Sequence, residues 1–209
     1  MPNKIGIIDY GISNIHNVIQ AFNYIGANPT LISCKKDILS TDYLVLPGVG
    51  AFEKGIKSLR EKNLIESIYN HINADNPFLG ICLGMQLLMT KSFEFGEHAG
   101  LDIISGYVKK IPNIDKDGNK QKIPHIGWNN LHATQNMKLL KDIDSHDYMY
   151  FVHSYSVICE KVDNIIASTS YNNINITAMI GSNNCYGCQF HPEKSGSKGL
   201  KILENFINL

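Results

Sequence analysis

In the first half of the chain, short apolar runs alternate with longer stretches whose apolar residues recur at helical spacing. Short apolar runs are typical of strands buried on both faces of a parallel sheet. The predicted strands are residues 4–11, 30–33, 42–48 and 77–82, and the predicted helices are residues 14–26, 51–74 and 83–93. Strands that alternate with helices indicate an α/β fold with a doubly wound, mostly parallel sheet.

The second half of the chain has a different pattern. Its apolar segments are short, rich in β-branched and aromatic residues, and separated by turns of Asn, Gly and Asp. Segments joined so directly predict antiparallel strands added to the parallel sheet. These strands are expected at residues 106–111, 125–133, 148–158, 165–171, 176–183 and 185–192. Residues 113–122 form a polar loop or hairpin tip, and residues 196–209 close the chain as an amphipathic helix.

Length and composition predict one globular domain over residues 1–209, with 44% hydrophobic and 18% charged residues. The formal net charge of zero argues against broad electrostatic binding of nucleic acid. Neither a signal peptide nor an apolar run of membrane-spanning length is apparent, so we expect a cytoplasmic protein that does not bind membranes. The five cysteines are then expected to be reduced, and an odd cysteine is a candidate nucleophile.

The stretch GICLGMQ at residues 80–86 places Cys82 where a buried strand meets a helix. This G-x-C-x-G pattern is the cysteine counterpart of the nucleophile elbow, in which small neighbours permit a strained turn. The N–H groups that begin the helix favour the thiolate, and the Leu83 N–H would help to hold an oxyanion. A structural cysteine between packing glycines is equally compatible with the motif alone.

The stretch CQFHPEKSG contains the candidate base, His191. Residues two apart in an extended segment face the same side, so Glu193 can orient the His191 ring while the ring takes the Cys82 proton. Taken alone, a capped strand end with a solvated Glu is the commoner interpretation.

The stretch LPGVGAF follows the predicted strand at residues 42–48. Gly48 and Gly50 permit a peptide flip that aims an N–H at developing negative charge. By itself the stretch is more typical of an ordinary loop. It is a weak phosphate cradle, since no Lys-Ser/Thr pair follows.

Two other patterns compete with this interpretation. Cys185, Cys188 and His191 have the spacing of half a metal site, but positions three apart on a strand diverge and no second ligand pair follows, so no metal is expected. The stretch DYGISN at residues 9–14 lacks the third glycine and a convincing acidic residue of a dinucleotide loop.

Together, PGVGAF, GICLGMQ and QFHPEKS resemble the class I, triad-type glutamine amidotransferases over essentially the whole chain. DYGISNIHNV, PHIGWNNL and YFVHSY are similar, within that family, to the glutaminase subunits of imidazole-glycerol-phosphate synthases in histidine biosynthesis. The resemblance implies a flavodoxin-like fold and an enzyme that hydrolyses L-glutamine to L-glutamate and ammonia.

The resemblance also implies roles for individual residues and no cofactor. Cys82 attacks the amide carbon to form a glutamyl thioester, His191 moves the proton to ammonia, and Glu193 orients His191. The implied oxyanion-binding residues are Leu83, Gly48, Val49 and Gly50. The implied substrate-binding residues are Gly50, Gln86, Glu94, His153, Ser154 and Tyr155. Glu94 suits this role because a carboxylate pairs with the substrate α-ammonium group.

In the family, ammonia passes through a (β/α)₈-barrel cyclase subunit that makes imidazole-glycerol phosphate and aminoimidazole carboxamide ribotide. The implied heterodimer interface includes Asn14, Trp128, Tyr150 and Lys194. Large aromatic residues are common interface anchors, although a lone Trp is more often in a core. The resemblance also implies that the subunit is nearly idle alone, because the PGVG peptide must flip to complete the oxyanion hole.

Three alternatives remain open at this point. A paralogous glutaminase could supply ammonia for amidation of a nucleotide-linked surface sugar with the same triad. A free-standing cysteine hydrolase or peptidase of a related fold is disfavoured, since many of those place a His directly after the Cys, where this chain has Leu83. A non-catalytic scaffold is disfavoured because Cys82, His191 and Glu193 are all retained.

Overall fold

The computed structural model describes residues 3–12, 14–115 and 117–209. Its helices are α1 (Ile15–Tyr24), α2 (Lys35–Ile38), α3 (Phe52–Glu61), α4 (Ile65–Asn73), α5 (Leu83–Leu87) and α6 (Gly196–Phe206), with 3₁₀ turns at Lys138–Leu140, Val162–Asn164 and Pro192–Lys194. Its strands are β1 (Ile5–Ile8), β2 (Thr30–Ile32), β3 (Tyr43–Gly48), β4 (Phe78–Cys82), β5 (Met89–Ser92), β6 (His98–Ala99), β7 (Ile104–Lys110), β8 (His125–Asn130), β9 (His132–Ala133), β10 (Tyr148–His153), β11 (Tyr155–Cys159), β12 (Ile165–Tyr171), β13 (Ile174–Ser182) and β14 (Cys185–Cys188).

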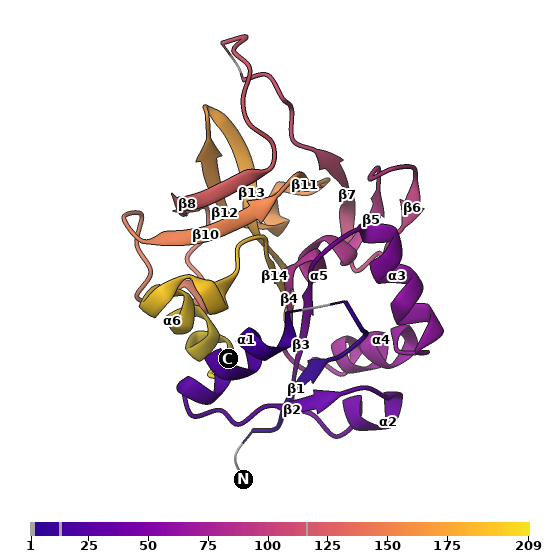
Figure 1. The fold of residues 1–209 in the computed structure, drawn as a ribbon. Helices are drawn as coiled ribbons and strands as arrows, with labels where there is room; N and C mark the ends of the chain where they lie inside the picture. The colour runs from indigo at the N-terminus through magenta and orange to yellow at the C-terminus, as the bar shows by residue number, and fades with distance from the viewer. Residues whose placement is uncertain (1–2, 13, 116) are drawn as a thin grey trace.

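The main sheet has the strand order β2-β1-β3-β4-β14-β13-β12-β9 (Figure 1). The strands from β2 to β14 pair in parallel, and β13, β12 and β9 continue the sheet with antiparallel pairing. The predicted flavodoxin-like, doubly wound sheet with added antiparallel strands is therefore confirmed.

Two smaller sheets cover the carboxyl end of the main sheet. One is the antiparallel pair β10-β8, and the other has the order β11-β7-β5-β6 (Figure 1). The single predicted strand at residues 148–158 is divided between them, because β10 ends at His153 and β11 begins at Tyr155. The sequence pattern did not predict that the second half of the chain would form more than one sheet.

The predicted strand at residues 125–133 is also divided, because β8 ends at Asn130 and pairs with β10 while β9 joins the main sheet. Three further predicted elements were wrong. The helix expected at residues 51–74 is broken into α3 and α4 around Asn63, which has a positive φ of 54°. The helix expected at residues 83–93 ends at Leu87 and is followed by β5. The last strand ends at Cys188, and Glu193 lies in a 3₁₀ turn rather than in an extended segment.

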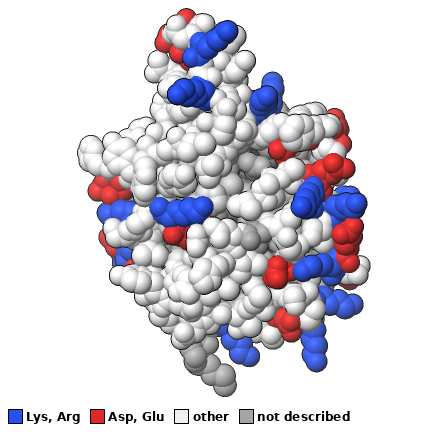
Figure 2. Space-filling model, viewed as in Figure 1, with Lys and Arg blue, Asp and Glu red and all other residues white. Residues whose placement is uncertain are grey.

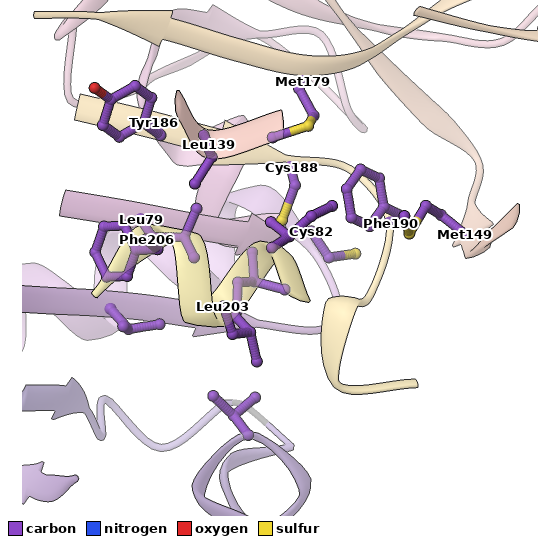
Figure 3. Close-up of a cluster of buried hydrophobic side chains, with 14 of the residues drawn as sticks. Leu79, Cys82, Leu139, Met149, Met179, Tyr186, Cys188, Phe190, Leu203 and Phe206 are labelled. Atoms are coloured by element: carbon purple, nitrogen blue, oxygen red, sulfur yellow. The ribbon is translucent and has the colours of Figure 1, made fainter. Parts of the chain in front are cut away.

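The core has two layers, one on each face of the main sheet. Side chains of α1 and α6 pack on one face, and side chains of α2, α3 and α4 pack on the other. Figure 3 shows the first layer, where Cys82 lies at its edge close to Cys188 and Phe190, above Leu203 of α6. The nucleophile candidate is therefore part of a buried core cluster.

Candidate active site

The elbow at Cys82 is built by a sharp change of backbone direction between β4 and α5. Cys82 has φ 55° and ψ −107°, a conformation that residues with side chains rarely adopt. A Cβ on Gly84 would overlap the Leu46 carbonyl oxygen, and a Cβ on Gly80 would lie 2.6 Å from the Gly84 carbonyl group. The two glycines therefore allow α5 to pack directly against β3 and β4.

His191 and Glu193 are joined by a short, buried contact. The Nδ1 atom of His191 lies 2.8 Å from the Glu193 carboxylate, and the two side chains are 3% and 1% exposed. Because Nδ1 is engaged by Glu193, Nε2 is the ring nitrogen of His191 that remains available for proton transfer. Nε2 is buried, and it has no regular hydrogen-bond partner in the described part of the chain.

Cys82 and His191 line the same pocket, whose volume is about 410 Å³. Burial lowers the pKa of His191, but the adjacent Cys82 sulfur and the Glu193 carboxylate outweigh burial and raise this pKa to about 10. The imidazole is therefore protonated at neutral pH. A protonated imidazole can give its proton to a leaving group.

A second histidine of the pocket, His153, has both ring nitrogens engaged. Its Nδ1 donates to the Tyr155 carbonyl oxygen at 2.8 Å, and its Nε2 lies 3.0 Å from Nδ1 of His125. Burial lowers the pKa of His153 to about 3, although the Tyr155 carbonyl opposes this shift. Of the two histidines that line the pocket, His191 is the one with a nitrogen available for proton transfer.

The oxyanion-hole candidates form two groups with different orientations. The Leu83 N–H is the first of α5 and points out of the helix start toward the elbow. The Val49 N–H instead donates to the Ile12 carbonyl oxygen at 3.2 Å. Gly50 has a φ of 98° and lies in the pocket wall beside Val49. Gly48 does not line the pocket, and it pairs with Cys82 where β3 and β4 end.

The predicted substrate-binding residues line this pocket, which contains Gly50, Gln86, Glu94, His153, Ser154 and Tyr155. Gln86 donates through Nε2 to the Tyr155 carbonyl at 3.2 Å and to the Gln189 amide oxygen at 2.9 Å. Glu94 accepts a 2.6 Å hydrogen bond from the Phe52 N–H at the start of α3. The protein therefore holds both side chains before any substrate arrives.

The predicted interface residues lie outside the pocket. Trp128 of β8 and Tyr150 of β10 are paired across the two strands with ring centroids 5.7 Å apart, and Trp128 is 52% exposed. Lys194 follows Glu193 in the 3₁₀ turn, and Asn14 precedes α1; both are partly exposed. These positions are reachable by a partner.

Sequence reasoning missed four residues of the site. Phe95, Pro124 and Val152 complete the pocket wall, and Gln189, which is fully buried, donates to the Cys82 sulfur at 3.7 Å. Gln189 was within the quoted stretch CQFHPEKSG, two residues before His191, and this position was the available signal. The other three carry no distinctive chemistry in the sequence.

The alternative metal pattern gains no support from the geometry. Cys185 and Cys188 are fully buried in β14, and burial raises the pKa of both thiols. Within residues 3–12, 14–115 and 117–209, His, Cys, Asp and Glu do not gather in threes that could hold a metal ion. Among the helices of these residues, none is long and apolar enough to cross a membrane.

Comparisons with known proteins agree with this site. The family model of glutamine amidotransferase class-I matches residues 6–209. Imidazole glycerol phosphate synthase subunit HisH 1 of Legionella pneumophila (strain Paris) is 45% identical, over 99% of this chain and 100% of that protein. Subunit HisH of Caldanaerobacter subterraneus subsp. tengcongensis is 49% identical, over 97% of this chain and 96% of that protein.

Solved structures resemble the fold at low sequence identity. The structure of PurLQS from Thermotoga maritima has a TM-score of 0.76 at 17% identity, covering 100% of this chain and 99% of that chain. A crystal structure of a glutamine amidotransferase has a TM-score of 0.75 at 14% identity, covering 98% and 97%. The chain belongs to the class-I glutamine amidotransferases, and within them to the HisH glutaminase subunits of imidazole glycerol phosphate synthase.

Proposed function

We propose that this glutaminase acts through Cys82 as nucleophile, His191 as proton carrier and Glu193 as the group that orients His191. The observation that carries this assignment is the arrangement of the three side chains. Cys82 and His191 line one pocket, and the unpartnered Nε2 of His191 is the ring nitrogen opposite the Glu193 bond. This is the nucleophile, base and orienting group of covalent catalysis.

The reaction begins from the thiolate and imidazolium pair. The sulfur attacks the side-chain amide carbon of glutamine, and the amide nitrogen takes the His191 proton and leaves as ammonia. The glutamyl thioester then reacts with water, which gives one proton to the neutral His191 and its hydroxide to the carbonyl carbon. The thiolate leaves, the product carboxylic acid loses its proton as glutamate forms, and the starting pair is restored.

The fixed side chain of Glu94 suits the α-ammonium end of the glutamine molecule. Glu94 uses one carboxylate oxygen for the Phe52 N–H, so the other oxygen can pair with the substrate α-ammonium group. Tyr155 and Ser154 also line the pocket, and the Tyr155 carbonyl accepts a hydrogen bond from Gln86. We propose that Gly50, Gln86 and His153 form part of the pocket wall that contacts the substrate.

The oxyanion hole requires a change at Val49. Its N–H is bonded to the Ile12 carbonyl, so rotation of the Gly48–Val49 peptide is needed before this N–H can join the Leu83 N–H at the developing oxyanion. Gly48 and Gly50 flank Val49 and lower the cost of the rotation. Glutamine hydrolysis by the chain alone is therefore expected to be slow.

The proposed partner is a (β/α)₈-barrel cyclase subunit that receives the ammonia, because the matched relatives are named as HisH subunits of a synthase. Its docking face is the outer side of β8 and β10. Ile126, Trp128 and Tyr148 are each more than half exposed on this pair of strands. Figure 2 shows that the surface over these strands carries few charged side chains. An apolar surface rimmed by polar residues is typical of a protein interface.

Within this proposal the protein works in the cytoplasm and supplies ammonia for histidine biosynthesis. The names of the matched relatives do not favour the surface-sugar alternative. No organic cofactor or metal is needed for thioester chemistry.

The test is covalent labelling with the glutamine analogue 6-diazo-5-oxo-norleucine, read by peptide mass spectrometry in the presence of the cyclase. Labelling of Cys82 and loss of ammonia production in Cys82→Ser are the expected results. Cys159→Ser is the matched control, since Cys159 lies in β11 outside the pocket. Retained ammonia production in Cys82→Ser would refute the assignment.

A further inference from the structure

We propose that His125 is a positioning residue of the glutaminase, which holds His153 in one neutral tautomer and thereby fixes the Tyr155 carbonyl at the substrate pocket. The inference rests on the proposed function, because it assigns His125 to the glutamine site. His125 does not line the pocket and its side chain is 1% exposed. It lies in the stretch PHIGWNNL, but the sequence pattern assigned it no role.

The structural basis is a chain of hydrogen bonds that begins and ends at backbone carbonyl groups, and its central His125–His153 bond is buried. The Asn129 amide nitrogen lies 3.1 Å from the Ser170 carbonyl oxygen and 2.9 Å from Nε2 of His125. Nδ1 of His125 lies 3.0 Å from Nε2 of His153, and Nδ1 of His153 lies 2.8 Å from the Tyr155 carbonyl oxygen.

The two carbonyl ends determine the position of every proton in this chain. A carbonyl oxygen accepts only, so His153 must carry its proton on Nδ1 to meet Tyr155. Nε2 of His153 is then an acceptor, and His125 must donate to it from its own Nδ1. Nε2 of His125 accepts in turn from Asn129, whose other amide hydrogen goes to Ser170. Both rings are neutral in this arrangement.

The surroundings favour the neutral form of both rings. His125 is stacked between Phe151, with centroids 5.0 Å apart, and Tyr171, with centroids 4.1 Å apart. Burial lowers the pKa of His125 to about 4. The ionisable group that acts on His153 besides His125 is His191, whose charge also disfavours a second imidazolium. His125 is therefore an uncharged donor at neutral pH.

The Tyr155 carbonyl is the point at which this chain meets the catalytic site. The same oxygen accepts from Gln86 Nε2 at 3.2 Å, Gln86 also donates to Gln189, and Gln189 donates to the Cys82 sulfur. Tyr155 and Ser154 line the pocket. Loss of the His125 donor frees His153 to change tautomer, and the Tyr155 carbonyl then loses the shorter of its two hydrogen bonds and keeps only the one from Gln86.

The experiment compares His125→Leu, which removes the donor, with His125→Asn, whose amide can replace the Nδ1 donor. Steady-state kinetics are measured in the complex with the cyclase. For His125→Leu we expect KM for glutamine to rise about tenfold while kcat falls less than about threefold, because one buried hydrogen bond at the substrate pocket is lost. His125→Asn restores most of the wild-type KM.

The matched control is His132→Leu, which removes an exposed histidine of β9 outside the pocket and is expected to leave KM unchanged. Thermal unfolding identifies a variant that does not fold. If His125→Leu does not fold, the decision rests on His125→Asn and on the NMR measurement below. Equal KM values for all variants, or a KM defect in His125→Asn as large as that of His125→Leu, would overturn the proposal.

Nitrogen-15 NMR of the imidazole groups tests the proton positions without any activity. The wild-type chain is expected to show His153 as the Nδ1–H tautomer, and His125→Leu is expected to populate the Nε2–H tautomer of His153. An Nε2–H tautomer in the wild type would refute the positioning role. Absence of Cys82 labelling in the wild type would instead refute the proposed function and leave the tautomer result standing.

Discussion

At Cys82 a single residue combines a strained backbone with a charged partner. Its φ of 55° costs about 1 to 3 kcal/mol, which the packed glycines and the core around the elbow must offset. The raised pKa of His191 depends in part on Glu193, because this carboxylate is bonded to the other side of the imidazole. The chemistry of the site is therefore set by the electrostatics of buried groups.

Glu193→Gln tests this electrostatic coupling. The change keeps an oxygen beside Nδ1 but removes the negative charge, so the raised pKa of His191 should fall from about 10 toward its ordinary value of 6.5. Proton NMR titration of the His191 ring measures this shift, with Glu97→Gln at an exposed glutamate as control. A His191 pKa that does not change would contradict the assigned role of Glu193.

At the scale of elements, the elbow depends on how closely α5 approaches β3. Gly84 lies where its Cβ would overlap the carbonyl oxygen of Leu46, a backbone atom that cannot move aside independently. The two strands β8 and β10 make a second element-scale feature. Their inner face carries His125 and His153, and their outer face carries Trp128 and Tyr150.

Gly84→Ala is expected to lower the free energy of unfolding by about 1 to 3 kcal/mol and to abolish glutaminase activity, because the strand and helix must separate. Gly55→Ala is the control. Its Cβ would meet flexible ends of the Leu87 side chain at 3.2 Å, and alanine favours the helix α3. Urea unfolding followed by circular dichroism gives both values, and equal stability of the two variants would contradict the close approach.

Trp128→Ala is expected to weaken binding of the cyclase by about 2 kcal/mol, roughly a thirtyfold increase in Kd, because an exposed aromatic anchor is removed. Labelling of Cys82 by the glutamine analogue at saturating cyclase should persist. Tyr24→Ala is the control, because Tyr24 is 80% exposed at the end of α1 and far from β8 in the fold. Calorimetric titration measures Kd. Unchanged affinity in Trp128→Ala would show that the interface does not include this face of β8 and β10.

At the scale of the whole molecule, buried histidines with opposite pKa shifts make stability depend on pH in both directions. Burial lowers the pKa of His125 to about 4 and of His153 to about 3 from 6.5, so protonation of the unfolded chain lowers stability as pH falls below 6.5. His191 shifts the other way, from 6.5 to about 10. Its stabilising contribution is complete below pH 6.5 and is lost as pH rises toward 10.

We therefore expect the free energy of unfolding to be highest near pH 6.5 and to decline on both sides. Chemical denaturation across a pH series measures this profile. His191→Asn should flatten the decline on the alkaline side and leave the acid side in place, since the two declines have different causes. A profile that keeps its alkaline slope in His191→Asn would contradict the raised pKa.

The alternation of strands and helices in the first half, and the three motifs with their order, could be predicted from the amino-acid sequence alone. This was possible because local periodicity, glycine spacing and nucleophile turns are properties of short segments. The sequence did not determine that residues 148–158 divide between two sheets, or that the helix after Cys82 ends at Leu87, because strand partners far along the chain decide both.

Only the tertiary structure brought β14 beside β4, and with it the assembly of the site. That pairing sets His191 against Cys82 and inserts Gln189 under the sulfur. The orientation of Val49 toward Ile12 and the proton order through His125 also depend on contacts between distant segments. Residue types specify what chemistry is available, but hydrogen-bond directions and burial arise only when separate segments pack together.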